Sequence, residues 1–136
     1  MLSNLGNILL FGSIFITLSI IYFAYQNLKE KNILIGKNLV YLSFFQITFI
    51  IASFLLLIFA FVFSDFSLLA VYQNSHTAKP IFYKIAGVWG NHEGSMLLWV
   101  LILASYGAAF SWGERTMPSS LHARILAVQG LMGIAF

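Results

Sequence analysis

Residues 38–64 read NLVYLSFFQITFIIASFLLLIFAFVFS and contain no charged side chain over 27 positions. As an α-helix that rises ~1.5 Å per residue, this run is about 40 Å long. The hydrocarbon core of a bilayer is about 30 Å thick, so such a helix can cross it with tilt to spare. The run therefore predicts a transmembrane helix.

Two further uncharged runs predict membrane spans before and after it. As helices, residues 8–24 are about 25 Å long and residues 94–112 are about 28 Å long. A fourth run follows Arg124 and reaches Phe136 after about 18 Å, which is too short to cross a bilayer alone. We therefore expect an all-α, polytopic helical integral membrane protein with three full transmembrane helices and the start of a fourth. On this basis we also expect the chain to be truncated or split.

The composition excludes an ordinary soluble domain. Hydrophobic residues make up 60% of the chain and charged residues 8%, against about 45–50% and about 25% in soluble proteins. The chain has no cysteine, which excludes disulfides, thiolate metal sites and thioether-linked haem on this chain. The net charge of +3 comes from few residues that flank apolar runs, a pattern that indicates membrane orientation. The expected partner is the lipid bilayer, and no nucleic acid.

The distribution of lysine and arginine predicts the orientation. Most of them lie in the first and third loops: Lys29, Lys31, Lys37, Arg115 and Arg124. The second loop carries only Lys79 and Lys84. Because basic loops stay in the cytoplasm, we expect the N-terminus and the loop from Asp65 to Glu93 to lie outside it.

The second loop contains a candidate short helix after Pro80, a residue suited to the first turn of a helix. Ile81, Ile85 and Val88 recur at helical spacing, and Lys84 is expected on the other side. This pattern is typical of a helix that lies in the membrane interface. The same residues fit the start of the third membrane helix equally well, so both interpretations stay open.

The segment WGNHEGSMLLWVLILASYGAAFSW, residues 89–112, has two different faces if it forms one helix. At about 100° per residue, one arc carries bulky side chains. They are Trp89, His92, Met96, Trp99, Leu103, Tyr106 and Phe110. Small residues lie opposite: Gly90, Gly94, Ala104, Ser105 and Ala108. The small face suits close approach of another helix, whereas the bulky face suits packing, an interfacial belt, or a flat apolar ligand such as haem.

Polar residues gather at the outer end of this segment. An Asn cap and a carboxylate in the first turn both stabilise a helix N-terminus, which would explain Asn91 and Glu93. Imidazole is also an axial ligand of haem iron, which makes His92 a candidate. A carboxylate at the membrane mouth is a candidate proton relay or a hydrogen-bond partner of the imidazole. His76 and His122 are interpreted as solvated polar residues.

Residues 65–103, DFSLLAVYQNSHTAKPIFYKIAGVWGNHEGSMLLWVLIL, resemble the N-terminal region of the CcmF family, the membrane subunit of the cytochrome c maturation haem lyase. The likeness covers most of the chain. Its most specific positions are Trp89-Gly90, His92-Glu93-Gly94-Ser95 and Leu97-Leu98-Trp99-Val100. It also includes Asp65-Phe66, Tyr72, Asn74-Ser75, Pro80 and Tyr83.

The resemblance implies part of a membrane haem lyase that holds haem and promotes its thioether attachment to apocytochrome c outside the cytoplasm. The implied cofactor is haem. The implied partners are other haem lyase and maturation subunits, a haem chaperone and apocytochrome c. The implied location is the bacterial inner membrane or the mitochondrial inner membrane. In the family, the tryptophan-rich haem segment and the haem-ligating histidines lie further along the chain, so no catalytic residue, haem ligand or metal ligand is assigned here.

The resemblance also divides the chain. Residues 1–88 are expected to form a two-helix membrane region with the outer loop, and residues 89–136 the incomplete start of the haem-handling domain. Within the second part we expect a haem-cavity or conformational cluster. Its members are Trp89, His92, Glu93, Gly94, Ser95 and Trp99.

Two other classes of function stay open. A small proton- or quinone-handling respiratory subunit would use Glu93 or Asp65 as a proton relay. Such relays normally need a carboxylate near the membrane midplane, and every acidic residue here falls at a span end or in a loop. A noncatalytic membrane scaffold would instead recruit partners through the small-residue face, which includes Gly94.

Overall fold

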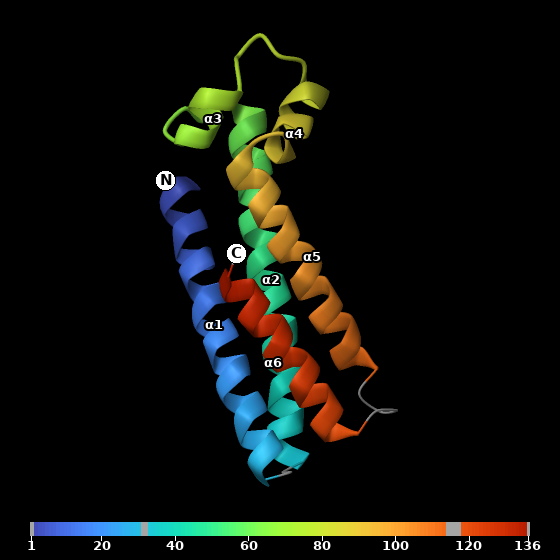
Figure 1. Ribbon diagram of the computed structural model, residues 1–136. Coiled ribbons are helices and arrows are strands. Elements are labelled where there is room, and N and C mark those ends of the chain that lie inside the picture. The colour runs from blue at the N-terminus through green and yellow to red at the C-terminus, as the bar shows by residue number, and fades with distance from the viewer. Residues whose placement is uncertain (1, 31–32, 114–117, 136) are drawn as a thin grey trace.

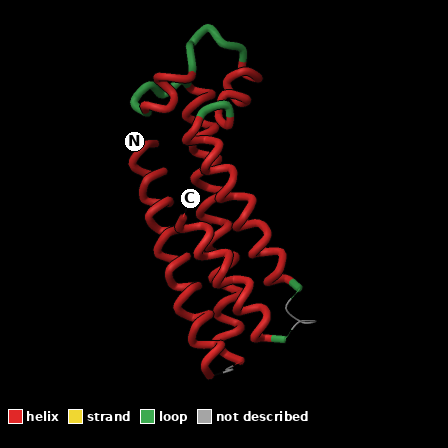
Figure 2. The backbone as a smooth tube through the Cα atoms, in the orientation of Figure 1, coloured by secondary structure: helices red, strands yellow, loops and turns green. Residues whose placement is uncertain are grey.

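Figure 1 shows the computed structural model, which describes residues 2–30, 33–113 and 118–135. Every regular element within these residues is an α-helix. They are α1 (Leu2–Glu30), α2 (Ile33–Phe63), α3 (Leu69–Asn74), α4 (Ile81–Trp89), α5 (His92–Trp112) and α6 (Ser119–Ala135). The long helices run side by side, and loops lie at the ends of the bundle (Figure 2). The predicted all-α class is confirmed.

Three of these helices are long and apolar enough to cross a membrane. The candidate spans are Asn4–Lys29, Gly36–Phe63 and His92–Trp112. The prediction of three full transmembrane helices is therefore confirmed. Helices α1 and α2 extend a few residues beyond the uncharged runs, because backbone hydrogen bonding continues into the polar link on both sides.

Helix α6 begins earlier than the sequence pattern predicts. The apolar run starts after Arg124, but the helix starts at Ser119. Pro118 precedes it, and its carbonyl accepts from the backbone N–H groups of Leu121 (3.0 Å) and His122 (3.2 Å). The helix start is therefore set by these backbone hydrogen bonds, and Arg124 lies in the second turn.

Helix α2 is the centre of the bundle. It contacts α1 and α5, while α6 packs between these two (Figure 1). The core that joins α1, α2 and α6 consists of fully buried residues: Ile20, Ala24, Leu39, Ala123 and Leu126. In lipid, close packing of such side chains holds helices together, because burial from water no longer drives their association.

A second core joins the end of α2 to α3 and α4. Its fully buried members are Ala60, Phe61, Val71 and Val88. Helix α2 ends here because Ser64 takes a left-handed φ of 55°. The Asp65 N–H then donates to the Ala60 carbonyl (2.9 Å), and the Ser64 N–H donates to the Phe61 carbonyl (3.2 Å). This helix end determines where α4 packs, and α4 in turn determines where α5 begins.

Helix α4 is turned differently from the prediction. Lys84 and Val88, one turn apart, form its buried face, whereas Phe82 is 85% exposed. The expectation that Lys84 lies on the other side of the helix from Val88 was wrong, because both residues are buried, whereas Ile81 is exposed. The Lys84 Nζ donates to Ser64 Oγ (2.7 Å) and to the Val62 carbonyl (3.5 Å). These acceptors lie at the C-terminus of α2, where the helix dipole attracts a cation.

Candidate functional site

The segment that carries the candidate residues is not one helix. Helix α4 ends at Trp89 and α5 begins at His92, with Gly90 and Asn91 between them. The condition of a single helix over residues 89–112, on which the interpretation of two faces depended, is therefore not met, and Trp89 does not share a helical face with the side chains of α5. We call residues 87–95 the elbow.

Asn91 holds the elbow through three hydrogen bonds. Its Nδ2 donates to the carbonyls of Gly87 (2.9 Å) and Val88 (3.1 Å), and its Oδ1 accepts from the Gly94 backbone N–H (2.7 Å). The Asn91 side chain is buried. One amide thus satisfies carbonyls at the end of α4 and caps the start of α5, which confirms the predicted cap.

Gly94 allows the two helices to meet closely. A Cβ atom at this position would overlap the backbone carbonyl of Val88, so any side chain would push α4 and α5 apart. The small size of Gly94 is therefore used within this chain, against the end of α4.

The other cluster residues are turned outward. Trp89 is 46% exposed, and His92 and Glu93 are also exposed. Ser95 is half-buried, and its Oγ donates to the His92 carbonyl (2.9 Å). Trp99 is 56% exposed and lies about 10 Å further along α5 than His92. Trp89, His92 and Glu93 thus lie within the elbow, and Trp99 lies outside it.

The rest of α5 separates small from bulky residues much as the sequence predicts. Its buried residues are Gly94, Ala104, Gly107, Ala108 and Ser111. Its exposed large residues include Trp99, Tyr106 and Phe110. The expectation for Ser105 was wrong, because this residue is exposed. Gly107 is also buried, against the Gln129 side chain of α6.

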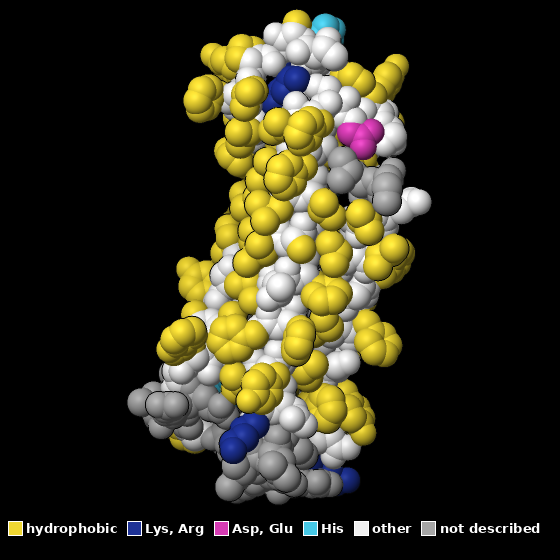
Figure 3. Space-filling view, turned by 180° about the vertical axis from the view of Figure 1, so that it is seen from behind, with side chains coloured by type: hydrophobic (Ala, Val, Ile, Leu, Met, Phe, Trp, Pro, Cys, Tyr) yellow, Lys and Arg dark blue, Asp and Glu magenta, His cyan; other side chains and the backbone are white. Residues whose placement is uncertain are grey.

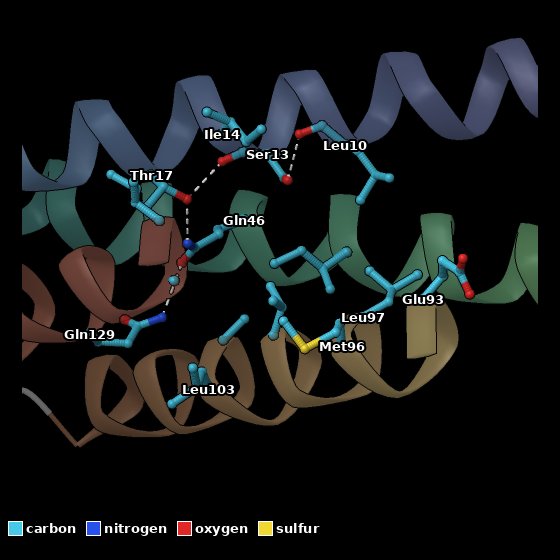
Figure 4. Close-up of a pocket in the computed structure, with 15 residues that line it drawn as sticks. Leu10, Ser13, Ile14, Thr17, Gln46, Glu93, Met96, Leu97, Leu103 and Gln129 are labelled. Atoms are coloured by element: carbon cyan, nitrogen blue, oxygen red, sulfur yellow. Dashed lines mark hydrogen bonds between the residues drawn. The ribbon is translucent and has the colours of Figure 1, made fainter. Parts of the chain in front are cut away.

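A cavity of about 340 Å³ lies beside the elbow, between α1 and α5 with α2 beneath it. Its lining is mainly apolar and includes Met96, Leu97 and Val100. Figure 4 shows Glu93 at one end of this cavity and Gln129 at the other. Glu93 also lines a neighbouring cavity of about 390 Å³. Glu93 is thus exposed and also lines the edge of two cavities.

A ladder of hydrogen bonds crosses three helices along this cavity. Gln46 of α2 donates from Nε2 to Thr17 Oγ1 of α1 (2.7 Å), and Gln129 of α6 donates from Nε2 to Gln46 Oε1 (3.3 Å). Thr17 in turn donates to the Ser13 carbonyl (2.7 Å), as Figure 4 shows. We call Thr17, Gln46 and Gln129 the polar ladder. The sequence analysis missed it, although a polar residue within an apolar run is itself a signal.

The cavities described for this chain offer haem iron no imidazole ligand. Haem iron takes an axial ligand such as imidazole, which has to face the bound ring. A further cavity of about 420 Å³ lies between α5 and α6. None of these three cavities has a histidine in its lining. His92 is exposed at the elbow. Within the described ranges, no group of three or more His, Cys, Asp or Glu residues could hold a metal ion.

The two remaining histidines differ from each other. His76 is exposed in the loop, and its Nδ1 accepts from the Ala78 N–H (3.2 Å). His122 is 1% exposed, and its Nε2 lies 3.3 Å from Ser111 Oγ. The interpretation of His122 as solvated was therefore wrong, because α6 begins before it and turns its ring toward α5.

Asp65 is the acidic residue that follows the second span. Hydrogen bonds from the Ser67 side chain and backbone N–H lower the pKa of Asp65 below its ordinary value. The backbone bond, from Ser67 N to Asp65 Oδ1, measures 3.1 Å. Asp65 therefore closes the start of the outer loop, and it lies away from the cavities described above.

Fold and site together define a polytopic α-helical membrane protein with a fixed, aromatic-bearing elbow at one end of its spans. The chain is 60% identical over 91 residues to the cytochrome c-type biogenesis protein ccl1 of Rhodobacter capsulatus, a match that covers 67% of this chain and 14% of that protein. It is 30% identical over 139 residues to the cytochrome c-type biogenesis protein CcmF of Haemophilus influenzae, with 100% and 21% covered.

A solved structure described as cytochrome c heme lyase CcmF matches with a TM-score of 0.91 and 25% identity, over 98% of this chain and 22% of that one. No family model matches the chain. The chain belongs to the CcmF-type cytochrome c biogenesis proteins, and it spans less than a quarter of the length of each of these three relatives.

Proposed function

We propose that this protein acts in cytochrome c maturation, as part of a membrane haem lyase that holds haem and promotes its thioether attachment to apocytochrome c. The names of the relatives and of the matching solved structure support this proposal. The structural observation that supports a role for this chain is the geometry of the elbow. There, Asn91 and Gly94 hold a fixed turn that exposes Trp89, His92 and Glu93.

In this proposal the elbow borders the haem site and does not ligate the iron. The cluster of Trp89, His92, Glu93, Gly94, Ser95 and Trp99 provides flat rings and one carboxylate on a rigid frame. Haem, when bound, supplies the vinyl groups to which the cytochrome thiols attach. The elbow residues would orient one edge of the ring and exclude water from it. The axial ligands would come from residues outside this chain.

We further propose that the elbow faces away from the cytoplasm, in the bacterial inner membrane or the mitochondrial inner membrane. Lys29 and Lys37 lie at the opposite end of the bundle from the elbow. Lys84, one of two basic residues near the elbow, has its charge directed into the end of α2. The proposed orientation rests on the larger number of lysine and arginine residues at the end opposite the elbow.

The proposed partners follow from the same function: other haem lyase and maturation subunits, a haem chaperone and apocytochrome c. Residues 89–136 would begin the haem-handling part, and residues 1–88 would support it. Packing favours close cooperation between the two parts, because α6 contacts α1 across this division.

The alternative functions find less support. A proton relay through the bundle would need titratable groups, whereas the polar ladder consists of amides and a hydroxyl. A scaffold that recruits partners through Gly94 would need this residue to be accessible, and Gly94 is buried against Val88.

The proposal is tested by replacing the exposed imidazole in the intact protein. We expect His92→Ala to lower haem-stained c-type cytochrome several-fold at an unchanged protein level. The matched control His76→Ala, an exposed loop imidazole, should leave it unchanged. Normal levels of c-type cytochrome in His92→Ala would show that His92 has no essential role in the proposed haem-site cluster. Normal levels after deletion of the whole gene would contradict the proposed function itself.

A further inference from the structure

The outward face of α4 is more apolar than its inward face. Ile81, Phe82 and Tyr83 at the start of the helix are exposed, and Trp89 at its end is exposed as well. The one charged residue of the helix, Lys84, is instead buried. A helix bathed in water would have the opposite arrangement, with its cation outside and its large apolar side chains inside.

Two contacts place α4 level with the last turns of α2. Gly87 of α4 lies beside the Phe61 ring of α2, because a Cβ atom added at Gly87 would be 3.6 Å from that ring. The Lys84 Nζ reaches Ser64 Oγ (2.7 Å). The candidate span of α2 runs as far as Phe63. Helix α4 therefore crosses the end of a membrane span at the depth where hydrocarbon gives way to headgroups.

The apolar surface is continuous with the membrane-spanning surface. Only Gly90 and Asn91 separate α4 from the span formed by α5. Helix α3, on the other side of the loop, also exposes Leu69 and Tyr72. In Figure 3, hydrophobic side chains continue from the flank of the bundle up to its loop-bearing end, where charged side chains are also visible.

We propose that α4 is an in-plane membrane anchor whose outward face inserts into the headgroup and upper acyl region of the lipid bilayer. Ile81 and Phe82 contact the acyl chains, while Tyr83 lies with its hydroxyl group at headgroup level. On the opposite side of the helix, Lys84 bonds to Ser64 at the end of α2. Because the elbow includes the end of α4, this anchor sets the depth of His92 and Glu93 relative to the membrane surface.

The test measures lipid exposure of this face in the intact protein, reconstituted in phosphatidylcholine and phosphatidylglycerol vesicles. A nitroxide spin label is attached at Phe82→Cys, and the matched control label at Lys79→Cys in the loop before α4. This segment has no native cysteine to compete for the label. Oxygen, which concentrates in lipid, and a water-soluble nickel chelate are then compared as relaxation agents.

We expect oxygen to relax the label at position 82 several-fold more strongly than nickel does, and the reverse at position 79. A second label at Ile81→Cys should repeat the result if Phe82→Cys perturbs the fold. Strong nickel relaxation at both 81 and 82 would show that the face lies in water and would overturn the proposal. Weak relaxation by both agents would show that protein covers the face, which would also overturn it.

Discussion

The middle of the bundle and the elbow are held together in different ways. In the middle, side chains bond to side chains, as Thr17, Gln46 and Gln129 do across three helices. At the elbow, side chains bond mainly to backbone: Asn91 bonds to Gly87, Val88 and Gly94. The first arrangement buries its polar groups inside the bundle. The second satisfies helix ends and leaves neighbouring rings exposed for contact with a ligand or partner.

This difference explains how the elbow can be rigid and still expose functional side chains. The residues that fix the turn, Asn91 and Gly94, are not the residues that are exposed there. Trp89, His92 and Glu93 are exposed, whereas Asn91 is buried and bonds to the backbone, so the identity of the exposed residues is available for function. The following predictions test this separation, from the largest expected effect to the smallest.

The largest effect is expected from Gly94→Ala. A Cβ atom there would overlap the Val88 carbonyl, so α4 and α5 must move apart at a cost of about 3 kcal/mol. The measurement is thermal unfolding in detergent together with the amount of protein in the membrane. The control is Gly133→Ala, where no atom lies within 4 Å of the added Cβ. Equal stability of both variants would show that the elbow is not tightly held.

A smaller effect is expected from Gln46→Ala, which breaks the polar ladder at its centre. Hydrogen bonds between membrane helices contribute about 1 kcal/mol, so the free energy of unfolding in bicelles should fall by about that amount. Gln26→Ala is the matched control, because Gln26 donates to the exposed Tyr22 hydroxyl of its own helix. If both variants lose the same stability, the ladder contributes nothing particular to helix association. Elbow function should survive Gln46→Ala.

The smallest effect concerns Asp65. Its pKa is lowered in the folded protein by the Ser67 hydrogen bonds, so its carboxylate stabilises the fold above the unfolded pKa, and this contribution is lost as the pH falls through the folded pKa. Asp65→Asn should therefore flatten the pH dependence of the unfolding midpoint below about pH 4. Identical pH profiles for the variant and the natural sequence in this acidic range would contradict the prediction.

Most of the fold could be predicted from the sequence, because a span in lipid needs only a long uncharged run, and such a run is visible without any tertiary contact. Residues 38–64 and 94–112 illustrate this. The break at Gly90 and Asn91 was missed even though Asn91 was correctly interpreted as a cap. The apolar spacing of the segment continues through the break, and spacing alone cannot show where one helix stops and the next begins.

The contacts that were not predictable join residues far apart in the chain. Gln46 and Gln129 are 83 positions apart, and Lys84 and Ser64 are 20 apart. The inward direction of Lys84 depends on the exposed end of α2, which no local pattern around residue 84 contains. His122 is buried for a similar reason, because the packing of α6 against α5 decides its surroundings.

The central claim is that the exposed half of the elbow acts in cytochrome c maturation while the buried half supports the fold. The most direct measurement replaces Trp89, His92 and Glu93 together by alanine and quantifies haem-stained c-type cytochrome against the amount of the variant protein in the membrane. We predict a normal amount of protein and a several-fold loss of haem-linked cytochrome. Undiminished cytochrome at a normal protein level would contradict the claim.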